Sequence, residues 1–424
     1  MYEYIFESKI ATLILGLVIA MISFCIINGF KNSFQDAVRL LIYSFPPIFG
    51  LGYLVSALFS DSEINKIDLL ACLVFEYAIF AVQVVVFVKI KNFVYKGMDL
   101  TPGVKKRICI LFFVLLVIDF YILNPLSYTT SRLDYLSVSS FNKYITYFSI
   151  LYTSIMAVFV AGHINKNAKL TKFDVVILFF VFCFSIMTGS KGAFFLFVLQ
   201  IMSLLNYRRY NISFSRVIIA GGCLSILFLA SGFYISQKNG ISLQEFISLG
   251  VSRFFLSNDA RALAFDYRFY SEQPSISELL ANSFRSIAVI IGHPPTDPPL
   301  GNLLFQYLYH QASSNGANTS ISALILYYSK DGEAILSALL LLAILLPIIL
   351  LLYLCIRFVK EKAVRLSLLA SLYLCLTLMV QDFLSFQLIM IIFFALFTLL
   401  LGIAVLQKAS WRHNEFSHNN NSQL

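Results

Sequence analysis

The chain has 424 residues, of which 59% are hydrophobic and only 12% are charged, and its formal net charge is +9. A soluble domain carries about 25% charged residues, so this chain has too little polar surface to cover a globule in water. The composition excludes soluble enzymes, disulfide-rich secreted scaffolds and disordered proteins, and it predicts a polytopic helical membrane protein. All 7 cysteines lie in apolar runs and no two have Cys-x-x-Cys spacing, so we expect buried thiols and neither a zinc site nor disulfides.

Apolar runs long enough to cross a bilayer, which takes about 20 residues, recur along the chain. They lie at 10–30, 40–59, 67–88, 108–126, 144–164, 217–235, 334–356, 366–379 and 388–406. The segment 175–207 is also apolar except at Thr188-Gly189-Ser190-Lys191-Gly192, which we interpret as the turn between two short spans or within a re-entrant hairpin. The sequence thus predicts an all-α polytopic integral membrane protein with about 11 transmembrane helices (about 10–12).

Lysine and arginine are unevenly distributed between the two sets of connecting loops. Most of the 31 basic residues lie in one set, whereas acidic residues outnumber basic ones in the other. Short cytoplasmic loops are enriched in Lys and Arg, so we predict that the basic face and the C-terminus are cytoplasmic and that the N-terminus lies outside. The positive charge is then a topology signal, and no nucleic-acid partner is predicted.

One hydrophilic stretch, 237–333, contains no convincing span and lies on the predicted outer face. It divides the chain into an N-terminal transmembrane bundle (1–236), a large outward-facing loop (237–333), C-terminal transmembrane helices (334–406) and a cytoplasmic tail (407–424). Its Gly-His-Pro-Pro-Thr-Asp-Pro-Pro segment at 292–299 predicts a stiff extended turn. Long loops of this kind are usually functional when they are not disordered, so we expect an active site here.

Three arginines of this stretch, Arg253, Arg261 and Arg268, would lie within an arc of about 80° on one continuous helix. Asp259 and Asp266 would point to roughly the opposite side. A row of guanidinium groups suits the recognition of a phosphate or pyrophosphate, because Arg presents a planar fork to its oxygens. The alternative is a solvated basic face whose arginines pair with the aspartates.

Further cationic and titratable side chains lie on the predicted outer face. Lys191, with glycines on both sides, is either an anion-binding residue or a snorkelling lysine at a helix end. Arg285 lies in the long outer stretch together with His293 and His310. Each histidine is either a general base or an ordinary surface residue.

Three acidic residues, Glu76, Asp119 and Asp382, fall inside apolar runs. Carboxylates in a membrane are costly and are functional candidates by default. Asp382 lies near the outer end of its span, where it would reach water, and Glu76 is the most central, with either a structural or a functional role. The chain has no Walker lysine loop, Gly-x-Gly-x-x-Gly, His-Glu-x-x-His or Asp-x-Asp motif, which disfavours ATP-driven transport and a metal-dependent transferase.

Two short motifs accompany the many spans around one dominant outer loop. Thr188-Gly189-Ser190-Lys191-Gly192 is similar to a Gly-Ser-Arg/Lys turn of the Wzy-type O-antigen polymerases, which join oligosaccharide repeat units in bacterial inner membranes. Gly316-Ala317-Asn318-Thr319-Ser320, followed by Tyr327-Tyr328-Ser329-Lys330-Asp331-Gly332, resembles that family's Asn-Thr…Gly passage into the next span. The resemblance implies a GT-C-like membrane glycosyltransferase architecture with a periplasmic loop, in the bacterial inner (cytoplasmic) membrane.

The resemblance also implies a reaction between two undecaprenyl-pyrophosphate-linked sugars, in which the growing chain leaves its lipid carrier and joins a fresh repeat unit. Cationic side chains would then stabilise the leaving pyrophosphate, and aromatic rings at 267–270 would stack on sugars. The implied catalytic residues are Arg253, Arg261, Arg268, His310 and Asp266, with His293 and Asp259 as further candidates for the general base. The implied pyrophosphate-binding residues are Lys191, Arg285 and Arg253.

No metal or other cofactor is implied, because the lipid pyrophosphate bond supplies the energy. The expected partners are the undecaprenyl-pyrophosphate-linked oligosaccharide, the lipid bilayer and a polysaccharide chain-length regulator. Two other functions stay open. An O-antigen ligase would use the same donor but transfer it to lipid A–core, and a flippase or other transporter of lipid-linked oligosaccharide would account for Glu76 and Asp119. The absence of detectable internal repeats argues against transport.

Overall fold

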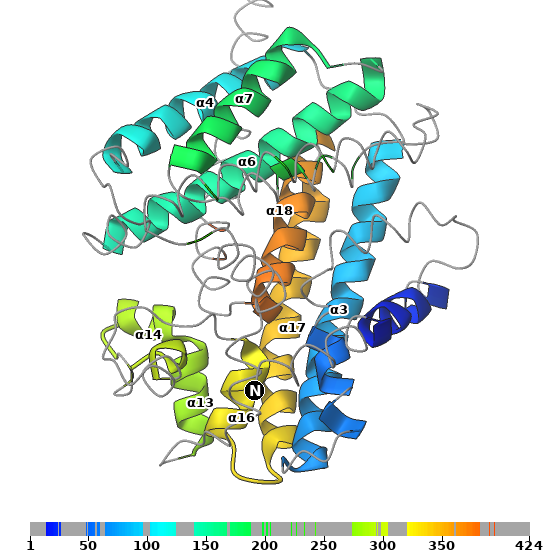
Figure 1. The fold of residues 1–424 in the computed structure, drawn as a ribbon, viewed down its shortest axis with the longest axis vertical. Coiled ribbons are helices and arrows are strands. Elements are labelled where there is room, and N and C mark those ends of the chain that lie inside the picture. The colour runs from blue at the N-terminus through cyan, green and yellow to red at the C-terminus, as the bar shows by residue number, and fades with distance from the viewer. Residues whose placement is uncertain are drawn as a thin grey trace, which may run out of the picture.

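The structure is a computed structural model that describes the following parts of the chain: 14–26 and 48–59 with gaps, 64–95, 102–123, 140–167, 170–187, 274–303 with gaps, 320–359, 362–381 and isolated residues between 197 and 242 and at 390 and 394. These parts are largely helical and contain no β-strand, which confirms the all-α fold class (Figure 1). The division of the chain into domains stays a prediction.

Most predicted apolar runs in the described parts are helices. The long helices are α3 (Lys66–Tyr95), α4 (Pro102–Leu123), α6 (Ser140–Asn167), α7 (Lys172–Met187), α17 (Ala334–Phe358) and α18 (Lys362–Gln381). Shorter helices follow in the hydrophilic stretch: α13 (Ile276–Ser283), α14 (Arg285–Ile290) and α16 (Ile321–Tyr328). Some long helices extend beyond the apolar runs, by seven residues at the end of α3 and six at the start of α4, because flanking Lys and Arg residues are themselves good helix formers.

Two of the described helices are long and apolar enough to cross a membrane, namely Lys66–Ile90 of α3 and the whole of α17. Shorter apolar helical segments are Ile14–Ser23, Gly50–Phe59, Ile110–Ile122 and Ile155–Asn165. The predicted spans at 217–235 and 388–406, and the second half of 175–207, lie largely outside the described residues. The number of 11 spans is therefore not tested by the structure.

Helix α17 is apolar on both of its faces. Leu341, Leu345 and Leu352 are buried against other helices, whereas Leu339 and Leu350 are more than half exposed. A helix that is hydrophobic all round suits the core of a large protein or a bilayer. Pro347 lies inside the helix, a position that membrane helices tolerate better than soluble ones. These features are consistent with a transmembrane character.

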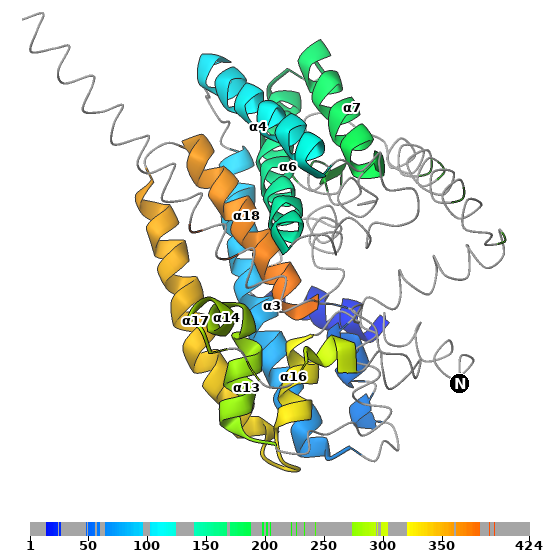
Figure 2. The same cartoon turned by 90° about the vertical axis from the view of Figure 1, so that its left-hand side faces the viewer.

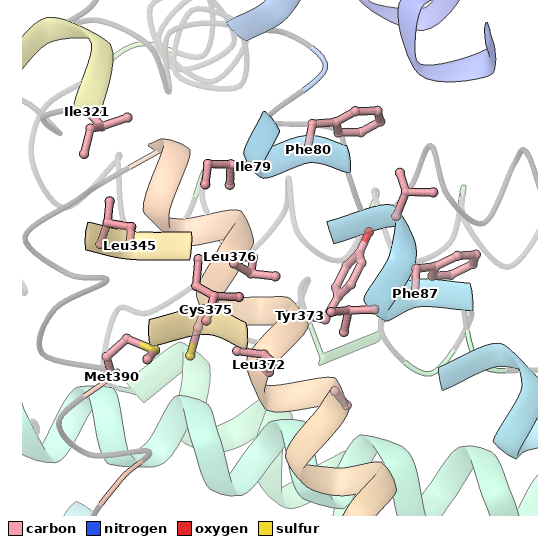
Figure 3. Packing of buried hydrophobic residues seen from close by; sticks show 14 of the residues in the cluster. Ile79, Phe80, Phe87, Ile321, Leu345, Leu372, Tyr373, Cys375, Leu376 and Met390 are labelled. Atoms are coloured by element: carbon pink, nitrogen blue, oxygen red, sulfur yellow. The ribbon is translucent and has the colours of Figure 1, made fainter. Parts of the chain in front are cut away.

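Helices α3, α17 and α18 pack together at the centre of the described part, α6 packs on α18, and α4 and α7 pack on α6 (Figures 1 and 2). Aromatic pairs join these layers: the rings of Phe87 and Tyr373 are 6.0 Å apart between α3 and α18, and those of Phe112 and Tyr152 are stacked at 5.4 Å between α4 and α6. Figure 3 shows the buried apolar cluster at the centre, to which α3, α16, α17 and α18 all contribute side chains.

Helices α3 and α17 begin at the same end of the bundle. The carboxylate of Asp68, in the first turn of α3, accepts hydrogen bonds from the backbone N–H groups of Gly332 (2.9 Å) and Ala334 (3.1 Å) at the start of α17. We call this end of the bundle the Asp68 end. Helices α13 and α16 pack against the half of α17 nearest to it (Figure 1).

Candidate functional site

In the described part of the hydrophilic stretch, two consecutive short helices, α13 and α14, meet at a bend at Phe284, and a short buried helix, α16, follows them. Ser275 caps α13, because its hydroxyl accepts a hydrogen bond from the Glu278 N–H at 3.2 Å. Phe284 then interrupts the helix, and α14 begins at Arg285. This α13–α14 pair packs on α16 and α17 through α13, which places it beside the Asp68 end of the bundle (Figure 2).

Arg285 is half-buried, and its side chain is held by a residue of the preceding helix, α13. Its Nη1 donates to Asn282 Oδ1 at 3.0 Å. Asn282 is buried, and its amide group in turn donates to the backbone carbonyl of Glu278 at 3.0 Å and to the Glu278 carboxylate at 3.4 Å. This chain of contacts fixes the orientation of a guanidinium group, which is the side chain best suited to bind pyrophosphate oxygens.

His293 lies just after α14, the second helix of the α13–α14 pair. Its backbone N–H donates to the Ala288 carbonyl at 2.8 Å and closes α14. The preceding residue, Gly292, has a φ of +83°, a conformation that side chains disfavour. The His293 residue is exposed. The structure therefore brings two of the predicted site residues, Arg285 and His293, to opposite ends of one six-residue helix.

The other predicted site residues lie outside the described residues, so the arginine row and its geometry stay a prediction. They are Arg253, Arg261, Arg268, Asp259, Asp266, His310 and Lys191, together with the aromatic residues at 267–270 and the membrane acid Asp382.

Helix α16, which follows the hydrophilic stretch, is buried along its whole length. All eight residues from Ile321 to Tyr328 are buried, and the helix packs against α3, α13, α17 and α18. Ser320 caps it: its hydroxyl accepts from the Ala323 N–H at 3.2 Å. Ser320, the last residue of the Gly316-Ala317-Asn318-Thr319-Ser320 motif, is thus the N-cap of a helix, and the next span begins only at Ala334.

Glu76 of α3 contacts this short helix. Its carboxyl oxygen Oε1 accepts a hydrogen bond from the hydroxyl of Ser322, and both residues are buried. One turn earlier on α3, the thiol of Cys72 lies 3.8 Å from the Ser322 carbonyl oxygen and donates to it. The sequence left open whether Glu76 has a structural partner, and the structure supplies one in Ser322.

The link between Asp68 and α17 could not be seen in the sequence. An acidic residue in the first turn of α3 suggests only that it stabilises the positive end of its own helix. The one visible signal was Gly332 in the Lys330-Asp331-Gly332 turn, whose φ of +82° requires a residue without a side chain. That signal predicts a turn but names no residue that would contact it.

Asp119 of α4 is also buried, at 7% exposure, and it interacts electrostatically with Tyr152 of α6. Within the described part of the chain, its Oδ2 has no hydrogen-bond partner.

A second polar cluster joins α6 to α7. Thr171 and Asp174 form a reciprocal cap at the start of α7: the Thr171 hydroxyl and N–H donate to Asp174 Oδ2 at 2.6 and 3.1 Å. His163 Nδ1 lies 2.5 Å from the same oxygen, and Asp174 is fully buried while His163 is 26% exposed. By the charge distribution of the loops, this turn belongs to the predicted cytoplasmic face.

Comparisons with protein-family models, with curated proteins and with solved structures find no match for this chain. Across the described residues, no group of three or more His, Cys, Asp or Glu side chains is placed to hold a metal ion.

Proposed function

We propose that the protein polymerises undecaprenyl-pyrophosphate-linked O-antigen or other polysaccharide repeat units at the periplasmic face of the bacterial inner membrane. About 11 spans in a GT-C-like architecture would surround the reaction site. The single observation that supports this most is the orientation of Arg285. Its guanidinium is held by Asn282 of α13, and the α13–α14 pair lies beside the Asp68 end of the bundle.

In the proposed reaction, the acceptor hydroxyl of the fresh lipid-linked unit attacks C1 of the sugar that joins the growing chain to its carrier. The bond between C1 and the pyrophosphate oxygen breaks, and a new glycosidic C–O bond forms. The hydroxyl proton passes to a base on the protein, for which His293, His310, Asp259 and Asp266 are the candidates. Undecaprenyl pyrophosphate leaves as an anion, and Arg285, Lys191 and the row of Arg253, Arg261 and Arg268 would stabilise its charge.

The test uses the surface polysaccharide ladder of a strain deleted for the gene. The deletion should leave one repeat unit capped onto the core, because flipping and ligation would still work. Wild type should restore the ladder, and Arg285→Ala and Arg261→Ala should reduce it by roughly 100-fold, since a lost contact to transition-state charge is worth ~3 kcal/mol. Lys330→Ala is the matched control, because Lys330 is an exposed cation near the Asp68 end but lies outside α13 and α14.

Other ladder patterns would contradict the proposal. A core without any repeat unit in the deletion strain would favour a flippase or an O-antigen ligase instead. An Arg285→Ala strain with a normal ladder would remove the residue on which the structural support depends.

A further inference from the structure

Three residues on one face of α3 contact the segment that leaves the hydrophilic stretch. Asp68, Cys72 and Glu76 are spaced four residues apart, so at 100° per residue they lie within about 80° of one another on the helix. We call them the polar face of α3. All three are buried, with exposures of 2%, 0% and 1% in that order.

The contacts of this face run in opposite directions along the two segments. Asp68 binds the N–H groups of Gly332 and Ala334, whereas Cys72 and Glu76 bind Ser322. Partner numbers fall as α3 residue numbers rise, so α16 runs antiparallel to α3. At 1.5 Å per residue, Glu76 lies about 12 Å farther along α3 than Asp68. The beginning of α16 is therefore deeper in the bundle than its end.

The depth of α16 is visible in the apolar packing as well. Figure 3 places Ile321, the first residue of α16, near Leu345 of α17 and Ile79 of α3. Leu345 and Ile79 lie more than two turns beyond Ala334 and Asp68. Ile321 thus lies at about the level of Glu76, and the chain runs from there toward the Asp68 end as α16 before α17 begins.

Apolar packing alone fixes this depth weakly. Hydrophobic contacts are not directional, so a short apolar helix packed among four others could shift along them with little loss of burial. A hydrogen bond between two buried polar groups favours one register, because any shift would break that bond in a low-dielectric interior, where its loss is costly. Glu76 and Ser322 form such a bond, and Asp68 holds the other end of the segment.

We propose that Glu76 is a positioning residue: its carboxyl holds α16 through Ser322 and so sets where the hydrophilic stretch re-enters the bundle. The structural role of Glu76 stands by itself, but its consequence for the reaction rests on the proposed polymerase function. That consequence is that the outer segment reaches its substrates only when α16 is docked. The competing role for an acidic residue in a span is to carry a proton, as in transporters. A glutamine keeps the acceptor oxygen for Ser322 but cannot carry a proton in this way, so it separates the two roles.

The first measurement is hydrogen–deuterium exchange of the peptide 321–328 in the purified full-length protein. Ser322→Ala and Glu76→Leu should raise its exchange about tenfold, the effect of losing one buried hydrogen bond, while 172–187 stays unchanged. Glu76→Gln should exchange like wild type. Ser371→Ala is the matched control for Ser322→Ala, since Ser371 is also buried and its hydroxyl has no partner among the described residues.

The second measurement is the polysaccharide ladder of the same four variants in the deletion strain, at matched protein levels in the membrane. Ser322→Ala and Glu76→Leu should shorten or abolish the ladder, and Glu76→Gln and Ser371→Ala should keep it. A general loss of stability would not explain a ladder that Glu76→Gln keeps and Glu76→Leu loses. The exchange of 172–187 reports stability elsewhere in the protein, so unchanged exchange there excludes a general effect.

Three outcomes would overturn the proposal. Unchanged exchange of 321–328 in both Ser322→Ala and Glu76→Leu would show that Glu76 does not hold α16. Faster exchange with a normal ladder would show that the docking of α16 is irrelevant to the reaction. Loss of the ladder in Glu76→Gln with normal exchange would assign Glu76 to proton transfer. A deletion strain with a normal ladder would instead refute the polymerase function itself, and the exchange result would still decide whether Glu76 docks α16.

Discussion

The two polar clusters of the described structure, one on α3 and one between α6 and α7, are built from contacts of very different range. The polar face of α3 binds residues 246 to 266 positions away in the chain. In the α6–α7 cluster, His163 and Asp174 are 11 positions apart and Thr171 and Asp174 only three. Both clusters bury an aspartate and both cap a helix, but only the first joins distant parts of the chain.

This difference separates a local from a global role for a buried carboxylate. Asp174 completes a cap at the start of its own helix and fixes a short turn. Asp68 caps a helix that begins more than 260 residues later, so it fixes how two long helices meet. Closing a long loop costs conformational entropy, and the α3 contacts help to offset that cost. We therefore expect changes on α3 to have the larger effects.

The largest expected effect on stability is that of Asp68→Ala. It removes the acceptor of two backbone N–H groups and should lower the free energy of unfolding by about 3–6 kcal/mol, because hydrogen bonds to a charged group are worth ~1.5–3 kcal/mol each. Thermal unfolding of the protein in detergent would measure this. Glu333→Ala is the control: Glu333 is the exposed N-cap residue of α17, and its side chain makes no capping hydrogen bond. Equal melting temperatures for the two variants would contradict the role of Asp68.

A smaller effect is expected from Gly332→Ala. The φ of +82° at Gly332 should cost an alanine about 1–2 kcal/mol. Its new Cβ would lie 3.6 Å from Asn65 Nδ2, which is ordinary contact, so the loss would come from the backbone conformation. Gly292→Ala has nearly the same φ of +83° with no atom near the new Cβ, and comparing the melting temperatures of the two variants isolates the link to Asp68. If Gly332→Ala were as stable as wild type, the turn would not need its left-handed conformation.

The smallest effect is expected from Thr171→Ala in the local cluster. Loss of the capping hydroxyl should cost about 1 kcal/mol and should raise hydrogen exchange in the first turn of α7 while leaving α3 and α17 unchanged. Thr171→Ser keeps the hydroxyl and should behave like wild type. Faster exchange at the start of α17 in Thr171→Ala would show that the two clusters are coupled, against the local role assigned here.

Much of the helical structure could be read from apolar runs. The runs at 67–88 and 334–356 predicted α3 and α17 closely, because a helix that crosses a membrane must satisfy its backbone hydrogen bonds within itself and needs only length and hydrophobicity. A turn at Gly332 is also compatible with a local reading of the sequence, since a residue with positive φ is usually glycine. The Thr-x-x-Asp pattern at 171–174 also carries its own cap within four residues.

The candidate site was less accessible to the sequence. Arg285 and His293 were singled out by residue type, but the bond from Arg285 to Asn282 depends on the break at Phe284 between two short helices. The hydrophilic stretch was expected to stand outside the bundle, and the apolar octet 321–328 within it is too short to signal a span. The structure packs this octet among α3, α13, α17 and α18.

The amino-acid sequence already determines the helices, their approximate ends and the turns that cap them, because these depend on neighbours a few residues apart. The folded structure alone decides which buried carboxylate meets which segment. In the sequence, Asp68 is an acidic residue at the start of an apolar run and Glu76 is one within the same run. Nothing near either residue in the chain points to Gly332 or Ser322. Their roles come from the packing of α3 against α16 and α17, and contacts between segments so far apart leave no local pattern in the sequence.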